Sequence, residues 1–238
     1  MFISFENMVT KEHSCISCSK EILDGSEFQL CENCLKNLDS IDGETCSKCG
    51  DRLKDGILRC EYCEGFGYEF DSNRSVCYYT DVSSKIVKGL KYGGRKYYAK
   101  HIARLMTKDK KFFEKFDLIT YVPVGKKRLR SRGFNQAEEI ANEISKLVNI
   151  PAVSLLSKTI ENKNQAKLSQ KERLENLKGT FDIDTSNKDK IKGKKILIVD
   201  DVFTTGATLS ECAKVLKSQK PKTVCSITFA KTRFNSIN

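Results

Sequence analysis

The stretch ILIVDDVFTTGAT, Ile196 to Thr208, decides the fold of this 238-residue chain. It begins with four apolar residues, Ile196 to Val199, a run expected of a parallel strand that is buried on both faces. Asp200 and Asp201 follow at once, and after them come a loop of small and hydroxyl residues and a helical pattern from Ala207 to Lys217. Ligands of open α/β sheets bind beyond the carboxyl ends of the strands. The stretch therefore predicts a ligand site at this strand end.

The loop after the acidic pair is typical of a phosphate site, since a helix amino terminus offers free N–H groups and a positive dipole end. We expect Gly206 to allow close backbone approach and the threonines to donate hydroxyls; the expected loop is Thr204, Thr205, Gly206, Ala207 and Thr208. Two carboxylates beside a phosphate suit the vicinal hydroxyls of a ribose 5-phosphate. A nucleotide loop of the GxxxxGK[ST] type is absent. Receiver domains also carry ILIVDD, but near their start rather than at residue 200.

Strand-like and helix-like patterns alternate outward from this stretch. We expect strands at 70–79, 117–124, 152–156, 196–199 and 224–229. We expect helices from the N-cap Asp81 to Gly93-Gly94, over 97–106, 135–148 and 207–217, and shortly after a capping box of Ser169 and Glu172. The alternation predicts an α/β fold, a mostly parallel sheet with helices on both faces.

Eight of the 11 cysteines fall in the first 63 residues, as four CxxC pairs: Cys15/Cys18, Cys31/Cys34, Cys46/Cys49 and Cys60/Cys63. Each pair can supply two thiolates to a tetrahedral Zn²⁺, and four thiolates leave no open position for catalysis. We expect two structural zinc sites in a module at residues 1–66, before an α/β domain at 67–238. Sequential pairing, first with second and third with fourth, is preferred; crossed pairing stays open. Cys77, Cys212 and Cys225 are expected to be buried.

Composition narrows the possible classes of protein further. The chain carries 42 basic and 31 acidic residues, a net charge of +11, which favours polyanionic partners or a lysine-rich solvated surface. No apolar run is long enough to span a bilayer, and the amino terminus lacks a signal-peptide pattern. We therefore expect a cytoplasmic protein without membrane insertion.

Positive charge is concentrated in KKRLRSR, which holds five cations in seven residues directly after the expected strand at 117–124. A strand end on the same edge as the phosphate loop favours a binding role over a merely solvated face. Pyrophosphate is the first expected ligand and single-stranded DNA the second. The expected basic edge comprises Val124, Gly125, Lys126, Lys127, Arg128 and Arg132.

ILIVDDVFTTGAT resembles the thirteen-residue motif of type I phosphoribosyltransferases, in which the acidic pair holds the ribose diol and the threonine–glycine loop the 5′-phosphate. With the cysteine pairs, LKYGG at 90–94, RGFNQA at 132–137 and QAKLSQKERLENLKGTF at 165–181, the chain resembles the competence protein ComF (ComFC) family over nearly its whole length. The resemblance implies a type I phosphoribosyltransferase-like fold behind a zinc finger.

The same resemblance implies phosphoribosyl pyrophosphate with Mg²⁺ as ligand, a pyrophosphate loop at 122–125, a flexible loop containing Gln165 and Arg173, and a role for Lys91. It also implies single-stranded DNA, a DNA-uptake helicase and other competence proteins as partners in natural transformation. Three functions remain open: a competence factor, a true phosphoribosyltransferase, and a sensor without chemistry. Only nine residues follow Phe229, so we expect no nucleobase hood there. No catalytic residue can be assigned.

Overall fold

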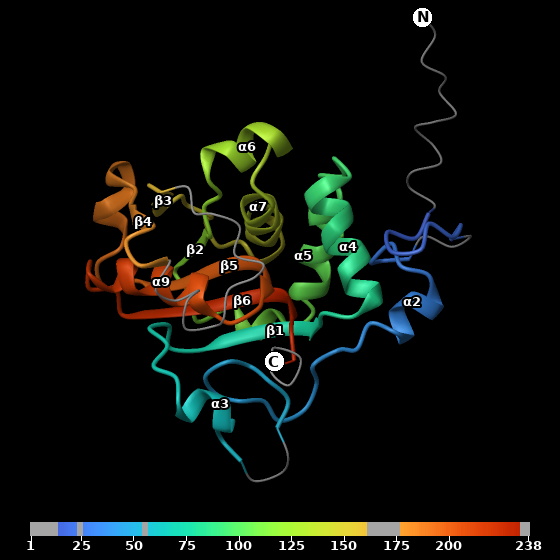
Figure 1. Ribbon diagram of the computed structural model, residues 1–238, viewed down its shortest axis with the longest axis horizontal. Helices are drawn as coiled ribbons and strands as arrows, with labels where there is room; N and C mark the ends of the chain where they lie inside the picture. The colour runs from blue at the N-terminus through green and yellow to red at the C-terminus, as the bar shows by residue number, and fades with distance from the viewer. Residues whose placement is uncertain (1–13, 23–25, 54–56, 161–176, 234–238) are drawn as a thin grey trace, which may run out of the picture.

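The computed structural model describes residues 14–22, 26–53, 57–160 and 177–233. Its main sheet has four parallel strands in the order β1-β6-β5-β2. The strands are β1 (Asn73–Tyr78), β2 (Leu118–Tyr121), β5 (Lys195–Phe203) and β6 (Thr223–Lys231). The predicted α/β class is therefore confirmed (Figure 1).

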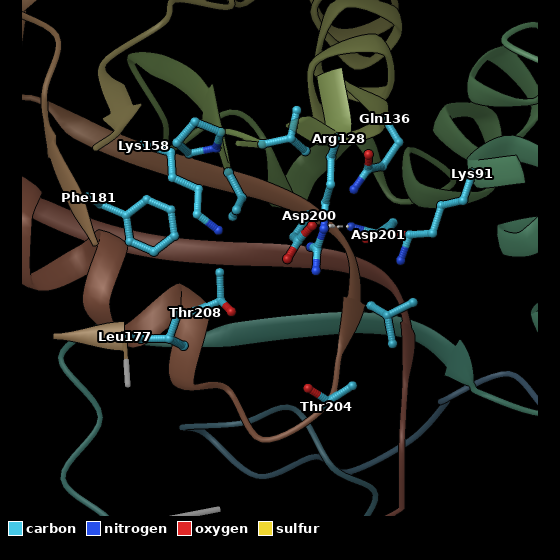
Figure 2. Close-up of a pocket in the computed structure, with 14 residues that line it drawn as sticks. Lys91, Arg128, Gln136, Lys158, Leu177, Phe181, Asp200, Asp201, Thr204 and Thr208 are labelled. Carbon is cyan, nitrogen blue, oxygen red and sulfur yellow. Dashed lines mark hydrogen bonds and ion pairs between the residues drawn. The ribbon is translucent and has the colours of Figure 1, made fainter. Parts of the chain in front are cut away.

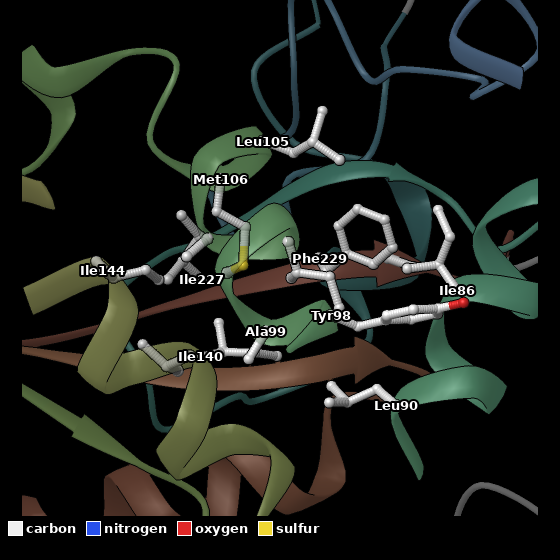
Figure 3. Packing of buried hydrophobic residues seen from close by; sticks show 14 of the residues in the cluster. Ile86, Leu90, Tyr98, Ala99, Leu105, Met106, Ile140, Ile144, Ile227 and Phe229 are labelled. Carbon is white, nitrogen blue, oxygen red and sulfur yellow. The ribbon is translucent and has the colours of Figure 1, made fainter. Parts of the chain in front are cut away.

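The two faces of the sheet are covered by different helices. Side chains alternate along β5, so that Leu197 and Val199 join one apolar cluster while Ile196 and Ile198 join the other. The first cluster includes residues of α4 (Asp81–Tyr92), α5 (Tyr98–Met106) and α7 (Gln136–Val148); the second includes residues of α9 (Ala207–Lys217). Figure 3 shows the first cluster, where α4, α5 and α7 pack on β6.

Most predicted elements occur close to their expected bounds, with three differences. The helix α4 has Thr80 rather than Asp81 as its N-cap; the Ser83 hydroxyl accepts from the Thr80 backbone N–H at 2.8 Å. The strand β5 does not end at Val199 but continues through Phe203, because β6 pairs with it as far as Phe203–Lys231. The expected strand at 152–156 is wrong, since Ala152 makes only an isolated bridge with Ile119, and Leu156 belongs to another strand, β3 (Leu156–Lys158).

A separate two-stranded antiparallel sheet takes the place of that expected strand. It consists of β3 (Leu156–Lys158) and β4 (Phe181–Ile183), with Leu156 opposite Ile183. The remaining described elements are short: α2 (Glu32–Lys36), α3 (Glu61–Glu64), α6 (Lys126–Arg132) and the 3₁₀ helices η1 (Lys110–Phe112) and η3 (Thr185–Lys190). The capping box of Ser169 and Glu172 lies outside the described residues.

The cysteine-rich segments flank the sheet domain on two sides. Cys15 and Cys34 join the apolar cluster of α4 and α5, and the Ser17 hydroxyl donates to the Val82 carbonyl at 3.3 Å. Cys46, Cys49 and Cys63 join the cluster on the α9 face. Figure 1 accordingly shows α2 beside α4 and α3 below β1. None of the helices within the described ranges has both the length and the hydropathy needed to cross a bilayer.

Candidate functional site

A pocket of about 220 Å³ opens at the carboxyl edge of the main sheet, where β2 and β5 end. Figure 2 shows the acidic pair in its centre, with Lys91 on one side and Lys158 and Phe181 on the other. The pocket is lined by Lys91, Val122, Pro123, Val124, Arg128, Gln136, Lys158, Leu177, Phe181, Asp200, Asp201, Val202, Thr204 and Thr208. The structure thus brings together the acidic pair, two threonines of the expected phosphate loop, and part of the expected basic edge.

Asp200 and Asp201 are consecutive residues of β5, so their side chains leave opposite faces of the sheet. Both are buried, with 8% and 3% of their surfaces exposed, although both line the pocket. Asp201 forms an ion pair with the Lys91 ammonium, which reaches it from the last turn of α4. Asp200 has its Oδ1 atom 2.9 Å from the Asp201 backbone nitrogen, whose N–H donates to it.

The two carboxyl groups consequently differ in pKa. Burial, together with the neighbouring Asp201 charge, raises the pKa of Asp200 well above its ordinary value. Burial acts in the same direction on Asp201, but the Lys91 ammonium outweighs it and holds the pKa of Asp201 below its ordinary value. Lys91 loses hydration as well, and the Asp201 charge still raises the pKa of its ammonium. Within the described residues, Lys91 therefore forms its ion pair with Asp201 and not with Asp200.

The expected phosphate loop, residues 204–208, connects β5 to α9. Gly206, the N-cap of α9, has a φ of 76°, a left-handed conformation that favours glycine. A Cβ atom at this position would lie 2.6 Å from the Phe203 ring and 2.7 Å from the Tyr68 ring. Thr204 and Thr208 line the pocket, and Thr205 is buried behind it. Ala207 is the first residue of α9, and its N–H donates to the Thr205 hydroxyl at 3.4 Å.

The basic edge forms a helix, α6, and only part of it borders the pocket. Gly125 is the N-cap of α6, and Val124 and Arg128 line the pocket. Lys126, Lys127 and Arg130 are exposed and are absent from its lining. Arg132 lies over the Tyr92 ring, with the guanidinium carbon 5.5 Å from the ring centroid, and donates to the Gln136 side chain.

Residues of the segment RGFNQA, 132–137, end α6 and begin α7. Gly133 ends α6 with a φ of 83°. Asn135 caps α7 by accepting from the Ala137 N–H at 3.0 Å, and its amide donates to the Val122 carbonyl at 3.0 Å. Gln136 lines the pocket. The motif therefore fixes α7 against the turn that follows β2.

Sequence reasoning missed the wall made by the β3–β4 sheet. Lys158 in β3 and Phe181 in β4 line the pocket, and the Lys158 ammonium lies 5.6 Å from the centroid of the Phe181 ring. We expected no hood after Phe229, but this wall comes from residues earlier in the chain. Three-residue strands give little sequence signal, which is why the pattern did not indicate them. The expected flexible-loop residues Gln165 and Arg173 lie outside the described residues.

The eight CxxC cysteines form two clusters, and the sequential pairing is the one the structure has. Within each cluster all four sulfur atoms lie within 4.8 Å of one another; the clusters are Cys15, Cys18, Cys31, Cys34 and Cys46, Cys49, Cys60, Cys63. Four mutually close thiols with these distances fit the donor set of a structural Zn²⁺. Each cluster could therefore hold one zinc ion. Cys77, Cys212 and Cys225 are buried outside both clusters, as expected.

The second cluster, that of Cys46, Cys49, Cys60 and Cys63, is connected to the phosphate loop by aromatic side chains. Tyr62 stacks on Phe66 with ring centroids 5.4 Å apart, and Phe66 lies 5.4 Å from Tyr68. The Tyr68 hydroxyl donates to the Thr205 carbonyl at 2.8 Å. On the next residue, the Glu69 N–H donates to the Ser210 hydroxyl of α9 at 3.0 Å.

Comparison with known proteins agrees with this architecture. The model of the phosphoribosyl transferase domain matches residues 129–234. Competence protein F of Haemophilus influenzae is 29% identical over 85% of this chain and 90% of its own length. Competence protein ComFC of Bacillus subtilis is 29% identical over 86% of this chain and 85% of its own. DNA utilization protein YhgH of Escherichia coli is 26% identical over 88% of this chain and 92% of its own.

Proposed function

We propose that this chain, a member of the family of competence protein F and ComFC, binds phosphoribosyl pyrophosphate with Mg²⁺ in the β2–β5 pocket and handles single-stranded DNA in the cytoplasm during natural transformation. The single observation that carries the ligand assignment is the pocket itself. It combines a buried acidic pair with a helix amino terminus and with cationic side chains. That combination matches a ligand with a sugar diol between two groups of phosphates.

The ribose 5-phosphate is the part of the ligand that β5 and α9 are suited to hold. Asp200 and Asp201 accept hydrogen bonds from its vicinal hydroxyls, because carboxylates are strong acceptors when desolvated. The 5′-phosphate lies against Thr204, Thr208 and the free N–H groups at the start of α9. Lys91 keeps Asp201 ionised, since its ammonium holds the pKa of that carboxyl low.

The pyrophosphate is directed toward the turn between β2 and α6. Val124 and Gly125 supply backbone N–H groups there, and Arg128 supplies a guanidinium that also lines the pocket. Lys158 is a further cation in the lining. Mg²⁺ arrives with the pyrophosphate oxygens, which are the hard ligands it prefers, and the neighbouring carboxylates favour its charge. Gln165 and Arg173, which lie outside the described residues, are further proposed contacts of this ligand.

Calorimetric titration with Mg²⁺–phosphoribosyl pyrophosphate tests the assignment. Each carboxylate hydrogen bond is worth roughly 1.5–3 kcal/mol, so Asp200→Asn/Asp201→Asn should bind at least about a hundredfold more weakly. The matched control is Asp189→Asn, an exposed carboxylate in η3 that does not line the pocket. Unchanged affinity in the double variant would overturn the assigned site.

Phosphoribosyl transfer is the second candidate function, and the β3–β4 wall favours it. The Phe181 ring and the Lys158 ammonium provide an apolar face and a polar group, as an aromatic nitrogen acceptor needs. In such a reaction the bond from ribose carbon 1 to the pyrophosphate oxygen breaks and a carbon–nitrogen bond forms. Pyrophosphate leaves with the bonding electrons, and the acceptor loses its proton to solvent. Pyrophosphate release with candidate acceptors distinguishes this enzyme from a binding protein.

The DNA and partner assignments rest on family membership and charge. Competence and DNA-utilization names among the relatives support a role with incoming single-stranded DNA, beside a DNA-uptake helicase and other competence proteins. A net charge of +11 favours a polyanion. The two cysteine clusters, each with one Zn²⁺, form the proposed docking module of residues 1–66, and the phosphoribosyltransferase-like domain occupies 67–238.

A further inference from the structure

The turn between α4 and α5 lies beside the pocket and carries exposed aromatic and basic residues together. Its sequence is KYGGRKYY, residues 91–98. Tyr92 is 78% exposed and Tyr97 38% exposed, whereas Leu90, two residues before Tyr92, is completely buried. Gly93 ends α4, and Gly94 with a φ of 61° turns the chain toward α5. The fold therefore presents a tyrosine ring to solvent at the end of a helix.

A cation already lies on one face of this ring. The Arg132 guanidinium is 5.5 Å from the Tyr92 ring centroid, which joins the α4–α5 turn to the end of α6. Arg132 also donates to Gln136 in the pocket lining, and Tyr92 directly follows Lys91, the partner of Asp201. Figure 1 shows α4 and α6 projecting on the same side of the sheet. Tyr92 therefore marks the rim of the pocket on the Lys91 side.

The two segments that meet at this rim contain no acidic residue. KYGGRKYY at 91–98 contributes three cations and KKRLRSR at 126–132 five. Lys91 is engaged with Asp201, and Lys96 pairs with Glu139 at 2.8 Å. Of the α6 cations, only Arg128 lines the pocket. The positive charge thus extends past the pocket, over more surface than one pyrophosphate covers.

We propose that Tyr92 is a stacking platform for an unpaired base of single-stranded DNA whose flanking phosphates lie along α6. This inference rests on the DNA-binding part of the proposed function and names its site. An exposed ring backed by a guanidinium favours stacking, because every base offers a π-face and the cation strengthens the ring stack. A duplex hides its base faces, so the surface selects single strands. The strand runs across the mouth of the pocket rather than into it.

Fluorescence anisotropy with a labelled oligothymidylate tests the platform. Tyr92→Ala should weaken binding about tenfold, within the range measured for loss of one base–aromatic stack. Tyr92→Phe keeps the ring and should stay within about twofold of the unchanged protein. A hairpin duplex of equal charge should bind more weakly than the single strand. Equal affinity of the Ala and Phe variants, or equal binding of duplex and single strand, overturns the proposal.

A second pair of variants tests whether DNA binding depends on the cations of α6 or on positive charge anywhere on the surface. Lys126→Ala/Lys127→Ala removes two α6 cations outside the pocket lining, while Lys110→Ala/Lys111→Ala removes two exposed cations before β2, at the opposite sheet edge. Only the first variant should lower the salt dependence of DNA binding, by about 0.7 in log–log slope per lost phosphate contact.

Calorimetry with Mg²⁺–phosphoribosyl pyrophosphate tests the pocket assignment separately from the DNA-binding platform. Tyr92→Ala should retain its affinity for that ligand, because the ring does not line the pocket. Loss of DNA binding with retained ligand binding supports the platform. Absence of DNA binding by the unchanged protein overturns the platform while leaving the pocket assignment intact.

Discussion

The Tyr68 hydroxyl donates a 2.8 Å hydrogen bond to the Thr205 carbonyl, across 137 positions of sequence. Tyr68 is buried, and its ring also closes the space beside Gly206. Lys231, buried in the same region, lies 3.7 Å from Asp51 and 4.3 Å from the Phe203 ring centroid. The phosphate loop is therefore held from behind by the part of the chain that forms the second cysteine cluster.

Tyr68→Phe should weaken binding of Mg²⁺–phosphoribosyl pyrophosphate with little loss of folding. The variant removes one hydrogen bond, worth about 1 kcal/mol, and leaves the Thr205 carbonyl without that donor. We expect affinity to fall about fivefold. Tyr97→Phe is the control, because Tyr97 packs against Tyr98 and His101 on the α4–α5 side and does not line the pocket. Equal effects of the two variants would contradict a specific role for Tyr68.

The protein should bind two Zn²⁺ per chain, because each four-cysteine cluster makes one closed site. Elemental analysis should return two metals for the unchanged protein, and one each for Cys31→Ser and Cys46→Ser. Cys225→Ser, outside both clusters, should keep both. A clearly lower metal content at full occupancy would falsify the two-site prediction.

The two zinc sites should differ in their effect on the pocket. Cys46→Ser disturbs the cluster that connects through Tyr62 and Phe66 to Tyr68, so it should weaken binding of the phosphoribosyl ligand. Cys31→Ser disturbs the cluster on the α4–α5 side and should affect that binding less. Calorimetry on the two single-metal variants measures the difference; the reverse order would show that the aromatic connection does not support the loop.

Asp200→Asn and Asp201→Asn should change stability in opposite directions at pH 7. The raised pKa of Asp200 means that the fold loses stability as pH rises from about 4, the ordinary Asp value, through the folded-state pKa. Asparagine removes that loss, so the melting temperature should rise by a few degrees, and the gain should vanish near pH 4. Asp201 has a lowered pKa, so its stabilising contribution is present at pH 7 and is lost only below about pH 4.

Asp201→Asn also leaves the Lys91 ammonium, only 22% exposed in its side chain, without its anion. A cost on the order of 2 kcal/mol would lower the melting temperature by about 5 °C. Thermal melts of both variants at pH 4 and pH 7 check the two predicted shifts in melting temperature. Equal and parallel shifts would show that Lys91 does not distinguish the two carboxylates.

The phosphoribosyl ligand and DNA should compete at Arg128 and not elsewhere on α6. Arg128 lines the pocket, whereas Lys126 and Lys127 are exposed outside its lining. Lys127→Ala/Arg128→Ala should therefore weaken binding of both ligands, and Lys126→Ala/Lys127→Ala only that of DNA. Saturating ligand should reduce DNA affinity in titrations at two salt concentrations. If DNA affinity survives both double changes but is lost on deleting residues 1–66, the zinc module is the DNA-binding part.

The sequence by itself determined what is local. The strand, the acidic pair, the phosphate loop and α9 are contiguous, so their order and spacing specify that half of the pocket. The CxxC pairs likewise predicted two metal sites, although only the structure distinguished sequential from crossed pairing. The extension of β5 to Phe203 was not visible locally, because it depends on pairing with β6.

Only the tertiary structure decided which distant residues complete the pocket. Lys91 on Asp201 and Tyr68 on Thr205 join segments more than a hundred positions apart. Lys158 and Phe181 enter the pocket through a short antiparallel pair with no sequence period of its own. Such contacts depend on how helices pack on the two faces of the sheet, and that packing is set by the buried surface of the whole domain rather than by any one segment.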